Sequence, residues 1–535
     1  MKRLGYRYCL ALCGLVLSCS AAAQDAKWGP HIDFEAKPGS KRNLGEADLF
    51  LPLAQDSRTL LFANLRTRFD NRDGYEGNLG LGVRRMLENG WNLGAYAYAD
   101  RRRTQLGNTF DQATFGVEAL GRDFELRANG YVPFGSRARE LAPVSNASIS
   151  GASVQVTTDF REERALKGFD AEAGWRTPLF DSEATRQLRV YLGGYRFADS
   201  GMSVSGPRVR AEFAVQELPW FGGRASVFVG AETQRDSARG TQNFAYVRLR
   251  IPLERESTGT RRLNAQERRM TAPVVRDIDI VTQSRTRGSL SETATVTAGG
   301  QAITILSSGT TTGAALPGAV AAAGANSTVI LTGSFTTTAS TTLQPGQTLM
   351  GAGPLAVRTP SGVVATLNAP GATINGNIPG SLGTITMANN STLRGMTIND
   401  TGTGAANSLG LLTDGVSGAV VVGNTITANG APADAVHGIS FLNSSNITVS
   451  GNTITANGGG NALALQYFNT SGIISNNTLS ASGSSGTNRA VLLVGGGGAT
   501  AVQAGSTGNN RVAGTCSTSG TVTGSVGFID GTTCP

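Results

Sequence analysis

Charge is almost missing from the C-terminal half of this 535-residue chain. From Ser289 to Pro535 there is no lysine, and four arginines stand against five carboxylates, which leaves a net charge of −1. The first 288 residues hold the other 42 basic and 33 acidic side chains, a net charge of +9, together with all four tryptophans. A contrast this sharp in so long a chain predicts at least two domains of different kinds.

Long apolar runs are also absent. Beyond the extreme N-terminus no stretch of 18 apolar residues occurs, which excludes a polytopic helical membrane protein. The 71 glycines show no three-residue period, which excludes collagen. The arginines of the first half are scattered along alternating segments and do not cluster, so we expect no nucleic-acid partner in spite of the basic composition.

Cysteine is scarce, and three of the five cysteines lie within residues 1–23. That stretch has a basic start, a short apolar core at 10–17 and small residues at 21–23, which predicts a secretory signal peptide. Lipidation at Cys19 is the alternative. After cleavage only Cys516 and Cys534 remain, and an oxidising compartment favours a disulfide between them that would add ~3 kcal/mol, against two unpaired buried thiols.

Period-two alternation runs from residue 28 to about residue 253. For example, Leu61, Ala63 and Leu65 alternate with polar or basic neighbours. Each such segment has the ~9–12 residues of a tilted membrane-crossing strand. Twelve segments predict a closed antiparallel barrel with tight turns at 87–90 and 120–123 and a long loop at 135–163. A soluble β-sandwich is the alternative.

One face of these segments is polar and carries charges of both signs, which suits a wet lumen better than a protein core. The side chains that we expect to line the lumen are Arg66, Arg84, Glu118, Glu125, Arg127, Glu172, Arg208, Arg210, Glu212, Arg224, Glu232, Arg248 and Arg250.

Several motifs fall in the order of a known family. NLGLGVRR at 78–85, NGWNLGAYAYAD at 89–100, LRANGYVPFG at 126–135 and the exit segment 266–277 resemble the β-domain of the inverse autotransporters, the intimin/invasin family. After the signal peptide at 1–23, the resemblance implies an outer-membrane barrel at 24–255 and a linker at 256–288 that threads the lumen. It also implies a passenger at 289–535 on the bacterial surface.

The same resemblance implies partners: outer-membrane lipid, and periplasmic chaperones and barrel-assembly machinery during biogenesis. A short charged helix at 260–270 would meet the lumen carboxylates, because charge pairs gain strength in a narrow, partly dry channel. The chain lacks the peptidoglycan-binding module, immunoglobulin-like repeats and lectin-like tip of the best-known members. Receptor binding of the intimin or invasin kind is therefore not implied.

The uncharged half contains a repeat. Gly395, Gly423, Gly451, Asn476 and Asn509 mark equivalent points 28, 28, 25 and 33 residues apart, each near a short Val/Ile/Leu segment. This spacing predicts one coil of a right-handed parallel β-helix per repeat, with Asn ladders between coils, so the fold class is all-β throughout. Residues 327–333 and 342–351 resemble the first coils of pectin-lyase-like β-helices. A flexible Ser/Thr-rich stalk is the alternative.

Catalytic chemistry has few candidates in this half. Arg394, Asp400 and Asp414 form one group, and Asp434 with His437 forms another, but paired carboxylates at one height are missing. We therefore predict no catalytic, cofactor or metal residues and an adhesin that attaches cells or aggregates them. Its surface ligand would be a host receptor, a glycan or a second copy. A polysaccharide-acting surface enzyme is the alternative, and a channel with a 245-residue plug is disfavoured by lumen size.

Overall fold

The computed structural model describes residues 27–221, 225–253, 263–277, 279–378, 382–402, 407–431, 435–458, 460–484 and 487–534, so the expected signal peptide lies outside the described residues. The chain forms two compact units. The first unit contains the described residues up to Ala142 together with Phe160–Arg287. The second contains Pro143–Asp159 together with the chain from Gly288 onward. Across the described ranges, no helix combines the length and apolarity needed to cross a membrane.

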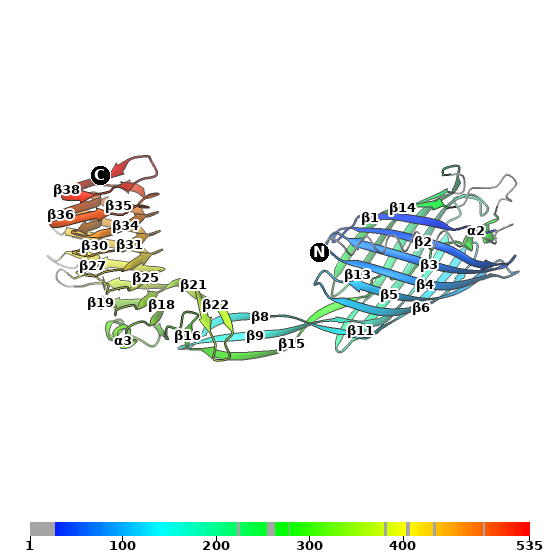
Figure 1. Cartoon of the computed structure of the whole chain (residues 1–535), viewed down its shortest axis with the longest axis horizontal. Helices are drawn as coiled ribbons and strands as arrows, with labels where there is room; N and C mark the ends of the chain where they lie inside the picture. The colour runs from blue at the N-terminus through cyan, green and yellow to red at the C-terminus, as the bar shows by residue number, and fades with distance from the viewer. Residues whose placement is uncertain are drawn as a thin grey trace. The chain divides into compact units, whose positions relative to one another are not determined.

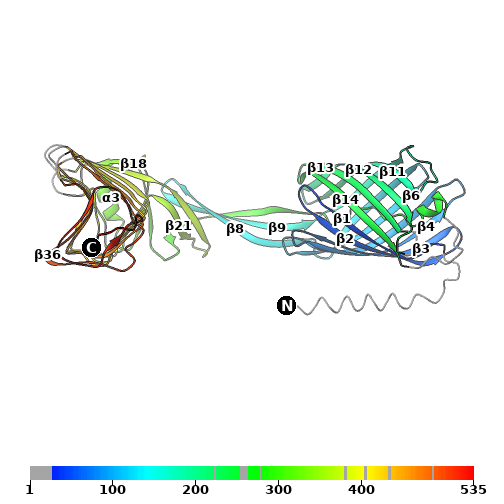
Figure 2. The ribbon, with the colours of Figure 1, turned by 90° about the horizontal axis from the view of Figure 1, so that it is seen from above.

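The first unit is a closed antiparallel barrel, in which the described residues form twelve strands as predicted (Figures 1 and 2). Each strand pairs with its sequence neighbour, except that β7 pairs directly with β10 and β1 closes the barrel against β14. The strands are β1 (His31–Lys37), β2 (Leu44–Gln55), β3 (Thr59–Asp70), β4 (Tyr75–Met86), β5 (Asn92–Arg103), β6 (Thr109–Leu120), β7 (Phe124–Phe134), β10 (Lys167–Arg176), β11 (Arg186–Asp199), β12 (Met202–Leu218), β13 (Ala225–Asp236) and β14 (Gly240–Pro252).

The barrel is inside-out relative to a soluble protein. Its outward face is apolar and exposed, and eight of the residues there are 55–66% exposed: Leu79, Leu81, Phe115, Val117, Phe124, Leu126, Phe169 and Leu192. Its inward polar residues are buried, as Asn64, Arg66 and Arg84 show. Since alternate residues of a strand point to opposite faces, the alternation in the sequence fixes both surfaces. A sandwich with an apolar core is excluded by this arrangement.

The second unit is dominated by a parallel β-helix (Figure 1). Its 20-stranded sheet, counted over the described residues, runs β17 (Ile303–Ser307), β18 (Thr328–Thr337), β19 (Thr341–Thr342), β20 (Thr348–Met350), β23 (Ala372–Gly376), β24 (Ile385–Thr386), β25 (Thr392–Arg394), β26 (Met396–Thr401), β27 (Ser408–Asp414), β28 (Val420–Val422), β29 (Thr425–Gly430), β30 (Ala435–Leu442), β31 (Ile447–Ser450), β32 (Thr453–Gly458), β33 (Asn461–Phe468), β34 (Ser471–Ser475), β35 (Thr478–Ser482), β36 (Arg489–Val502), β37 (Asn510–Ala513) and β38 (Thr515–Thr523). A short hairpin, β39 (Val526–Gly527) with β40 (Thr533–Cys534), follows.

Equivalent residues of successive coils stack in one apolar core. Val421, Val449 and Ile474 lie in register on adjacent strands and are fully buried. The helix α3 (Leu316–Ala322) adds Leu316 and Val320 to the same core. Stacked coils bury a continuous core only by contact with their neighbours, which explains the repeat in the sequence.

The repeated bends adopt the left-handed backbone conformation that glycine and asparagine tolerate. The φ angles at Gly395, Gly423, Gly451 and Asn476 are 59°, 64°, 66° and 55°. At the fifth repeat the predicted point is wrong by one residue, because Gly508 (φ 74°) makes the bend and Asn509 follows it. The sequence Gly508-Asn509-Asn510 offers three bend-forming residues in a row, and only glycine has no Cβ to strain there.

The long loop predicted at 135–163 is a second difference. It is a hairpin of two 13-residue strands, β8 (Ala138–Ser150) and β9 (Ser153–Ala165), and its residues 143–159 belong to the second unit. There they join a six-stranded sheet in the order β15 (Thr282–Ala294), β9, β8, β22 (Val364–Pro370), β21 (Ala352–Arg358) and β16 (Val296–Thr297). The physical reason is period-two alternation in the loop itself, with Val154 and Val156 on one face.

Candidate functional site

The lumen of the barrel is filled with ion pairs, and two of them each join a strand to the next but one. Arg84 Nε lies 2.5 Å from Glu118 Oε1, and neither side chain is exposed to solvent. Arg210 pairs with Glu172 at 2.7 Å. The side chains of the predicted lumen set that the structure buries are Arg66, Arg84, Glu118, Glu125, Arg127, Glu172, Arg208, Arg210, Glu212 and Arg250; Glu232 and Arg248 are largely buried, and Arg224 lies outside the described residues.

A segment from the exit side of the barrel lies among these charges. It begins with α2 (Ala265–Arg269), a single turn whose N-terminus is fixed by a capping box between Asn264 and Glu267. Trp28 Nε1 donates a hydrogen bond of 2.9 Å to the carbonyl of Glu267. The first residues of the barrel domain therefore hold the helix that precedes the passenger.

After α2 the segment runs without a strand partner, and barrel arginines satisfy its carbonyl groups. Arg84 Nη1 donates to the carbonyls of Met270 and Ala272 at 2.9 and 2.7 Å. Arg66 donates to Val274 at 2.9 Å, and Arg250 donates to Thr271 at 2.7 Å. A buried carbonyl without a partner is costly, so these inward arginines supply hydrogen bonds that no strand ladder can give here. These donors come from strands β4, β3 and β14.

Charge pairing also ties the segment to the barrel. Arg276 pairs with Asp100 at 3.0 Å, with both side chains fully buried. Arg269 contacts Glu125, one of the five lumen glutamates expected to meet the linker. The other four, Glu118, Glu172, Glu212 and Glu232, contact cationic side chains on the barrel strands.

Sequence reasoning missed Asp100 and Asp279. Asp100 stands at an inward position of the motif at 89–100, and its spacing from Tyr96 and Tyr98 could have placed it in the lumen. Asp279, which contacts Arg42 and Arg68, has no comparable pattern around it. A cavity of about 90 Å³ remains beside Pro273–Asp277, enough for a few water molecules.

A column of buried asparagines runs through the β-helix interior. The side-chain amide of Asn424 donates to Asn452, that of Asn452 to Asn477, and that of Asn477 to Asn509, over 2.9, 3.0 and 3.0 Å. Each acceptor oxygen also receives the backbone N–H of the preceding asparagine in the column. The expected Asn ladder is thus present, one residue after each bend, and it satisfies backbone groups where the chain turns.

One outer face of the β-helix is flat, polar and uncharged. Its outward residues come from β23, β26, β29, β32 and β35 and stand in register, so three columns of hydroxyl and amide groups run along the coils. We name this surface the Thr/Asn face. Its members are Thr373, Asn375, Thr397, Asn399, Thr401, Thr425, Thr427, Asn429, Thr453, Thr455, Asn457, Thr478, Ser480 and Ser482.

The catalytic candidates of this half do not converge. Asp400 is buried and accepts hydrogen bonds from Thr384 and Ser408 at 2.5 and 2.6 Å. Arg394 donates to the carbonyl of Pro354, and Asp414 accepts from Asn443. Burial raises the pKa of the Asp400 carboxyl, although the two hydroxyl donors oppose that shift.

The second candidate group is incomplete in the structure, because Asp434 lies outside the described residues. His437 Nδ1 lies 3.0 Å from Ser440 Oγ, and that hydroxyl donates onward to Gln466 at 3.1 Å. Burial lowers the pKa of His437 to about 4. In the part of the chain that the structure describes, no group of three His, Cys, Asp or Glu side chains is placed to hold a metal ion.

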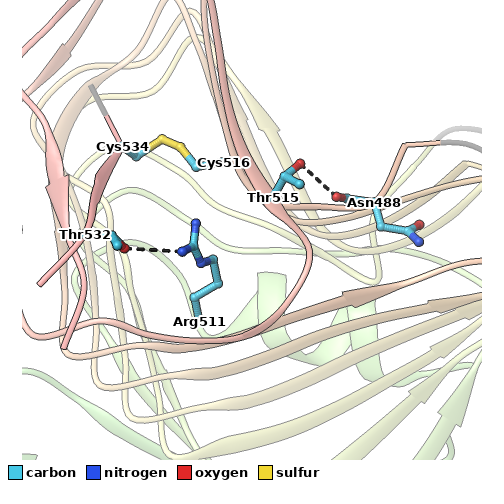
Figure 3. Close-up of a disulfide and its surroundings, with 6 residues drawn as sticks. All are labelled: Asn488, Arg511, Thr515, Cys516, Thr532 and Cys534. Carbon is cyan, nitrogen blue, oxygen red and sulfur yellow. Dashed lines mark hydrogen bonds between the residues drawn. A yellow bond between two sulfur atoms is a disulfide. The ribbon is translucent and has the colours of Figure 1, made fainter. Parts of the chain in front are cut away.

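The two cysteines of the second half form a disulfide across 18 residues, with their Cα atoms 5.7 Å apart (Figure 3). Cys534 is buried in the β-helix core, and Cys516 packs against that core. Nearby, Thr515 donates to the carbonyl of Asn488 at 3.1 Å, and Arg511 donates to Thr532 at 3.3 Å (Figure 3). The hairpin β39–β40 is therefore fastened to β38, the last strand of the long sheet.

Comparison with known proteins bears on the barrel. Residues 25–205 match the family described as "Inverse autotransporter, beta-domain". The uncharacterized protein YchO of Escherichia coli K12 is 29% identical over 146 residues, which cover 27% of this chain and 26% of that protein. The match thus spans about a quarter of the relative's length.

Solved barrels are similar at low identity. The β-domain of the Bordetella autotransporter BrkA is 12% identical, with a TM-score of 0.24 over 42% of this chain and 99% of that structure. The translocator domain of autotransporter NalP from Neisseria meningitidis is 10% identical, with a TM-score of 0.21 over 46% of this chain and 97% of that structure. Scores this low do not establish a shared fold, so the fold assignment depends on the strand topology described above.

The family match, the apolar outer band and the polar filled lumen agree on location and role. The barrel lies in the outer membrane and anchors the chain there, and the part that follows it is the exported passenger. Within the barrel unit, residues 25–205 carry the match to the inverse autotransporter β-domain.

Proposed function

We propose that this protein is a surface adhesin whose β-helix attaches cells to a surface or to one another. The observation that carries the proposal is the Thr/Asn face, which repeats the same neutral hydrogen-bonding groups over five strands. Strands of a sheet lie about 4.8 Å apart and alternate residues about 6.8 Å apart, so the face is a regular grid. Many weak contacts on such a grid add up to firm attachment.

Hydrogen bonds along the columns hold the grid in place. Asn399 donates to Asn375 at 3.1 Å, and Asn457 donates to Asn429 at 3.2 Å. Ser482 donates to Asn457 at 2.9 Å. Because these side chains are ordered by one another, a ligand that binds there loses less affinity to side-chain ordering. A neutral glycan or a second copy of the passenger fits this chemistry better than a charged partner does.

We infer that the passenger works by contact and not by catalysis. Asp400, Arg394 and Asp414 have separate hydrogen-bond partners, and Asp400 is enclosed by the core. Catalysis of polysaccharide cleavage needs carboxylates that face one substrate position. A screen of the purified full chain on acidic polysaccharides checks this inference, with Asp400→Ala and Asp414→Ala variants as controls for any activity found.

The lumen segment has a proposed role in this scheme. We propose that residues 256–288 form a linker that closes the channel after export, with the contacts of the described residues 263–277 as support. Closure keeps the outer membrane sealed while the passenger stays attached to its anchor.

The adhesin proposal is tested by placing a charge on the Thr/Asn face. Thr455→Lys should abolish attachment and autoaggregation of cells that display the chain, because the face would carry an unpaired cation. Thr448→Lys is the matched control, since Thr448 is an equally half-buried outward threonine on a different strand, β31. Equal adhesion of the two variants would show that the Thr/Asn face is not the adhesive surface. Adhesion by cells that lack residues 300–535 would exclude the adhesin proposal.

A further inference from the structure

The outer half of the β8–β9 hairpin is built into the core of the second unit. In the sequence, residues 143–159 come from between the barrel strands β7 and β10, yet they fold with the chain that starts at Gly288. Val154 and Val156 of this hairpin are each only 1% exposed. They share an apolar cluster with Ala294, Ile305, Ile330, Met350, Val357, Ala365, Leu367 and Ala369.

The cluster lies on the outer side of the first coils. In β18, Val329 and Leu331 point into the β-helix core, while Ile330 between them points into the hairpin cluster. The same division separates Leu349 from Met350 in β20. These strands are therefore covered by apolar groups on both faces, which is why their sequences are apolar without alternation.

Hydrogen bonds fix the register between β9 of the hairpin and β15, the first strand that follows the barrel in the chain. Gln155 Nε2 donates to Thr293 Oγ1 at 2.8 Å, and the hydroxyls of Thr157 and Ser291 lie 3.0 Å apart. Ser289 Oγ donates to Asp159 at 2.5 Å. On the other side of the hairpin, Ala147 of β8 pairs in parallel with Leu367 of β22.

We propose that residues 143–159 are a folding template on which the passenger begins its β-helix. Each coil of a β-helix is stabilised by its neighbours, so the first coil to form has no folded neighbour and is the least favourable. The hairpin supplies a preformed apolar surface against which the outer face of the first coils packs. Its own strands are joined by a two-residue turn, so it forms from local contacts without help from the passenger.

The barrel fixes the base of the hairpin before the passenger needs it. β7 and β10 pair in register from Tyr131 with Gly168 down to Phe124 with Trp175, so closure of the barrel brings the two ends of the hairpin together. The partner of this surface is thus the chain's own segment from residue 282 to residue 370. This inference concerns folding and does not depend on what the passenger binds.

The test changes the apolar side of the template in the full chain expressed in the outer membrane. The variant Val154→Asp with Val156→Asp puts carboxylates into the cluster. Val144→Asp is the matched control, because Val144 lies in the same hairpin and is 40% exposed. Barrel assembly is followed separately by heat-modifiable migration. Passenger folding is followed as the rate at which pulse-labelled passenger becomes resistant to protease added outside the cells.

We expect the double variant to gain protease resistance about tenfold more slowly than the control, because a substitution in a folding nucleus acts on the folding rate. Its barrel should migrate as in the unchanged chain. If the two variants fold their passengers at the same rate, the template proposal is wrong. If the double variant also loses its barrel, Val154→Ala and Val156→Ala must show slower passenger folding with an intact barrel, and unchanged rates in them overturn the proposal.

Discussion

The interiors of the two units are filled in opposite ways. Inside the barrel, charged side chains such as Arg84, Glu118 and Arg210 are buried in pairs. Inside the β-helix, apolar side chains such as Val421 and Ile454 stack from coil to coil. Both interiors consist of strand residues that point inward, so strand geometry alone does not decide what fills a closed space.

The difference lies in what each interior must hold. The lumen contains a segment whose carbonyl groups have no strand partner. Arg66, Arg84 and Arg250 donate hydrogen bonds to these carbonyls instead. The β-helix core, in the part that the structure describes, stacks on itself, and buried polar columns such as the one that starts at Asn424 serve its bends. The barrel interior is charged because it surrounds a segment that has no strand partner. The β-helix interior is apolar because its coils pack on one another.

The largest expected effect is in the barrel. Arg84→Ala removes two hydrogen bonds to the lumen segment and leaves Glu118 buried without its closest cation. Breaking a buried pair from one side costs about 4 kcal/mol, so the barrel should lose its heat-modifiable form at a clearly lower temperature. Arg58→Ala is the control, because the pair of Arg58 with Glu88 is exposed. Similar shifts for both variants would contradict the account.

The disulfide should matter next, and only at one end of the passenger. Changing Cys516 and Cys534 to serine removes a cross-link over 18 residues, which costs about 3 kcal/mol in the chain-entropy estimate. Since coils depend on their neighbours, fraying should start at the hairpin β39–β40 that the disulfide fastens to β38, and it should leave the first coils intact. Limited proteolysis with mass analysis of the fragments locates the cuts. Cuts spread evenly along the passenger would argue against this view of the disulfide.

The buried asparagine column should contribute less to stability than the disulfide does. Asn452→Ala removes the acceptor for the backbone and side chain of Asn424 and the donor to the carbonyl of Val421. Leaving such groups unsatisfied costs about 2 kcal/mol. Asn457→Ala, on the Thr/Asn face, is the matched control and should cost well under ~1 kcal/mol, because water replaces its partners. Chemical unfolding followed by circular dichroism measures both, and equal losses would show that burial is unimportant here.

The smallest effect is a pH dependence of the passenger. The pKa of His437 falls from 6.5 to about 4 in the folded chain, so the unfolded chain takes up a proton first. Stability that is present above pH 6.5 is therefore lost as the pH falls toward 4, by about 1.5 kcal/mol after allowance for the partial exposure of the ring.

Asp400 acts in the opposite direction. Its pKa is raised by burial, so its contribution to stability is full below 3.8 and is lost as the pH rises through the folded pKa. Unfolding of His437→Gln and of Asp400→Asn at several pH values separates the two groups. A His437→Gln variant that keeps the loss between pH 6.5 and 4 would contradict the assignment.

Much of the fold was predictable because strand faces appear directly in the sequence. The alternation at Leu79, Leu81 and Val83 indicates one lipid-facing surface. The even number of such segments is typical of a closed antiparallel barrel. Glycine bends such as Gly423 and Gly451 report the coils, since few other residues adopt that backbone.

Other features leave no local pattern. Every residue has a carbonyl, so nothing in the sequence shows that Met270 and Ala272 would be the acceptors of Arg84. The place of the hairpin in the second unit was missed because Val154 and Val156 meet partners well over a hundred residues away. In both cases the contact depends on which distant segments the fold brings together.

The closed lumen is the feature on which the contrast between the two interiors depends, and single-channel recording in a planar bilayer tests it most directly. The purified full chain should show no steady open current, because residues 263–277 occupy the lumen. A variant with Arg84→Ala and Arg250→Ala should open in steps, since both hold the segment by its carbonyls. A steady current through the unchanged chain, equal to that of the variant, would contradict the account.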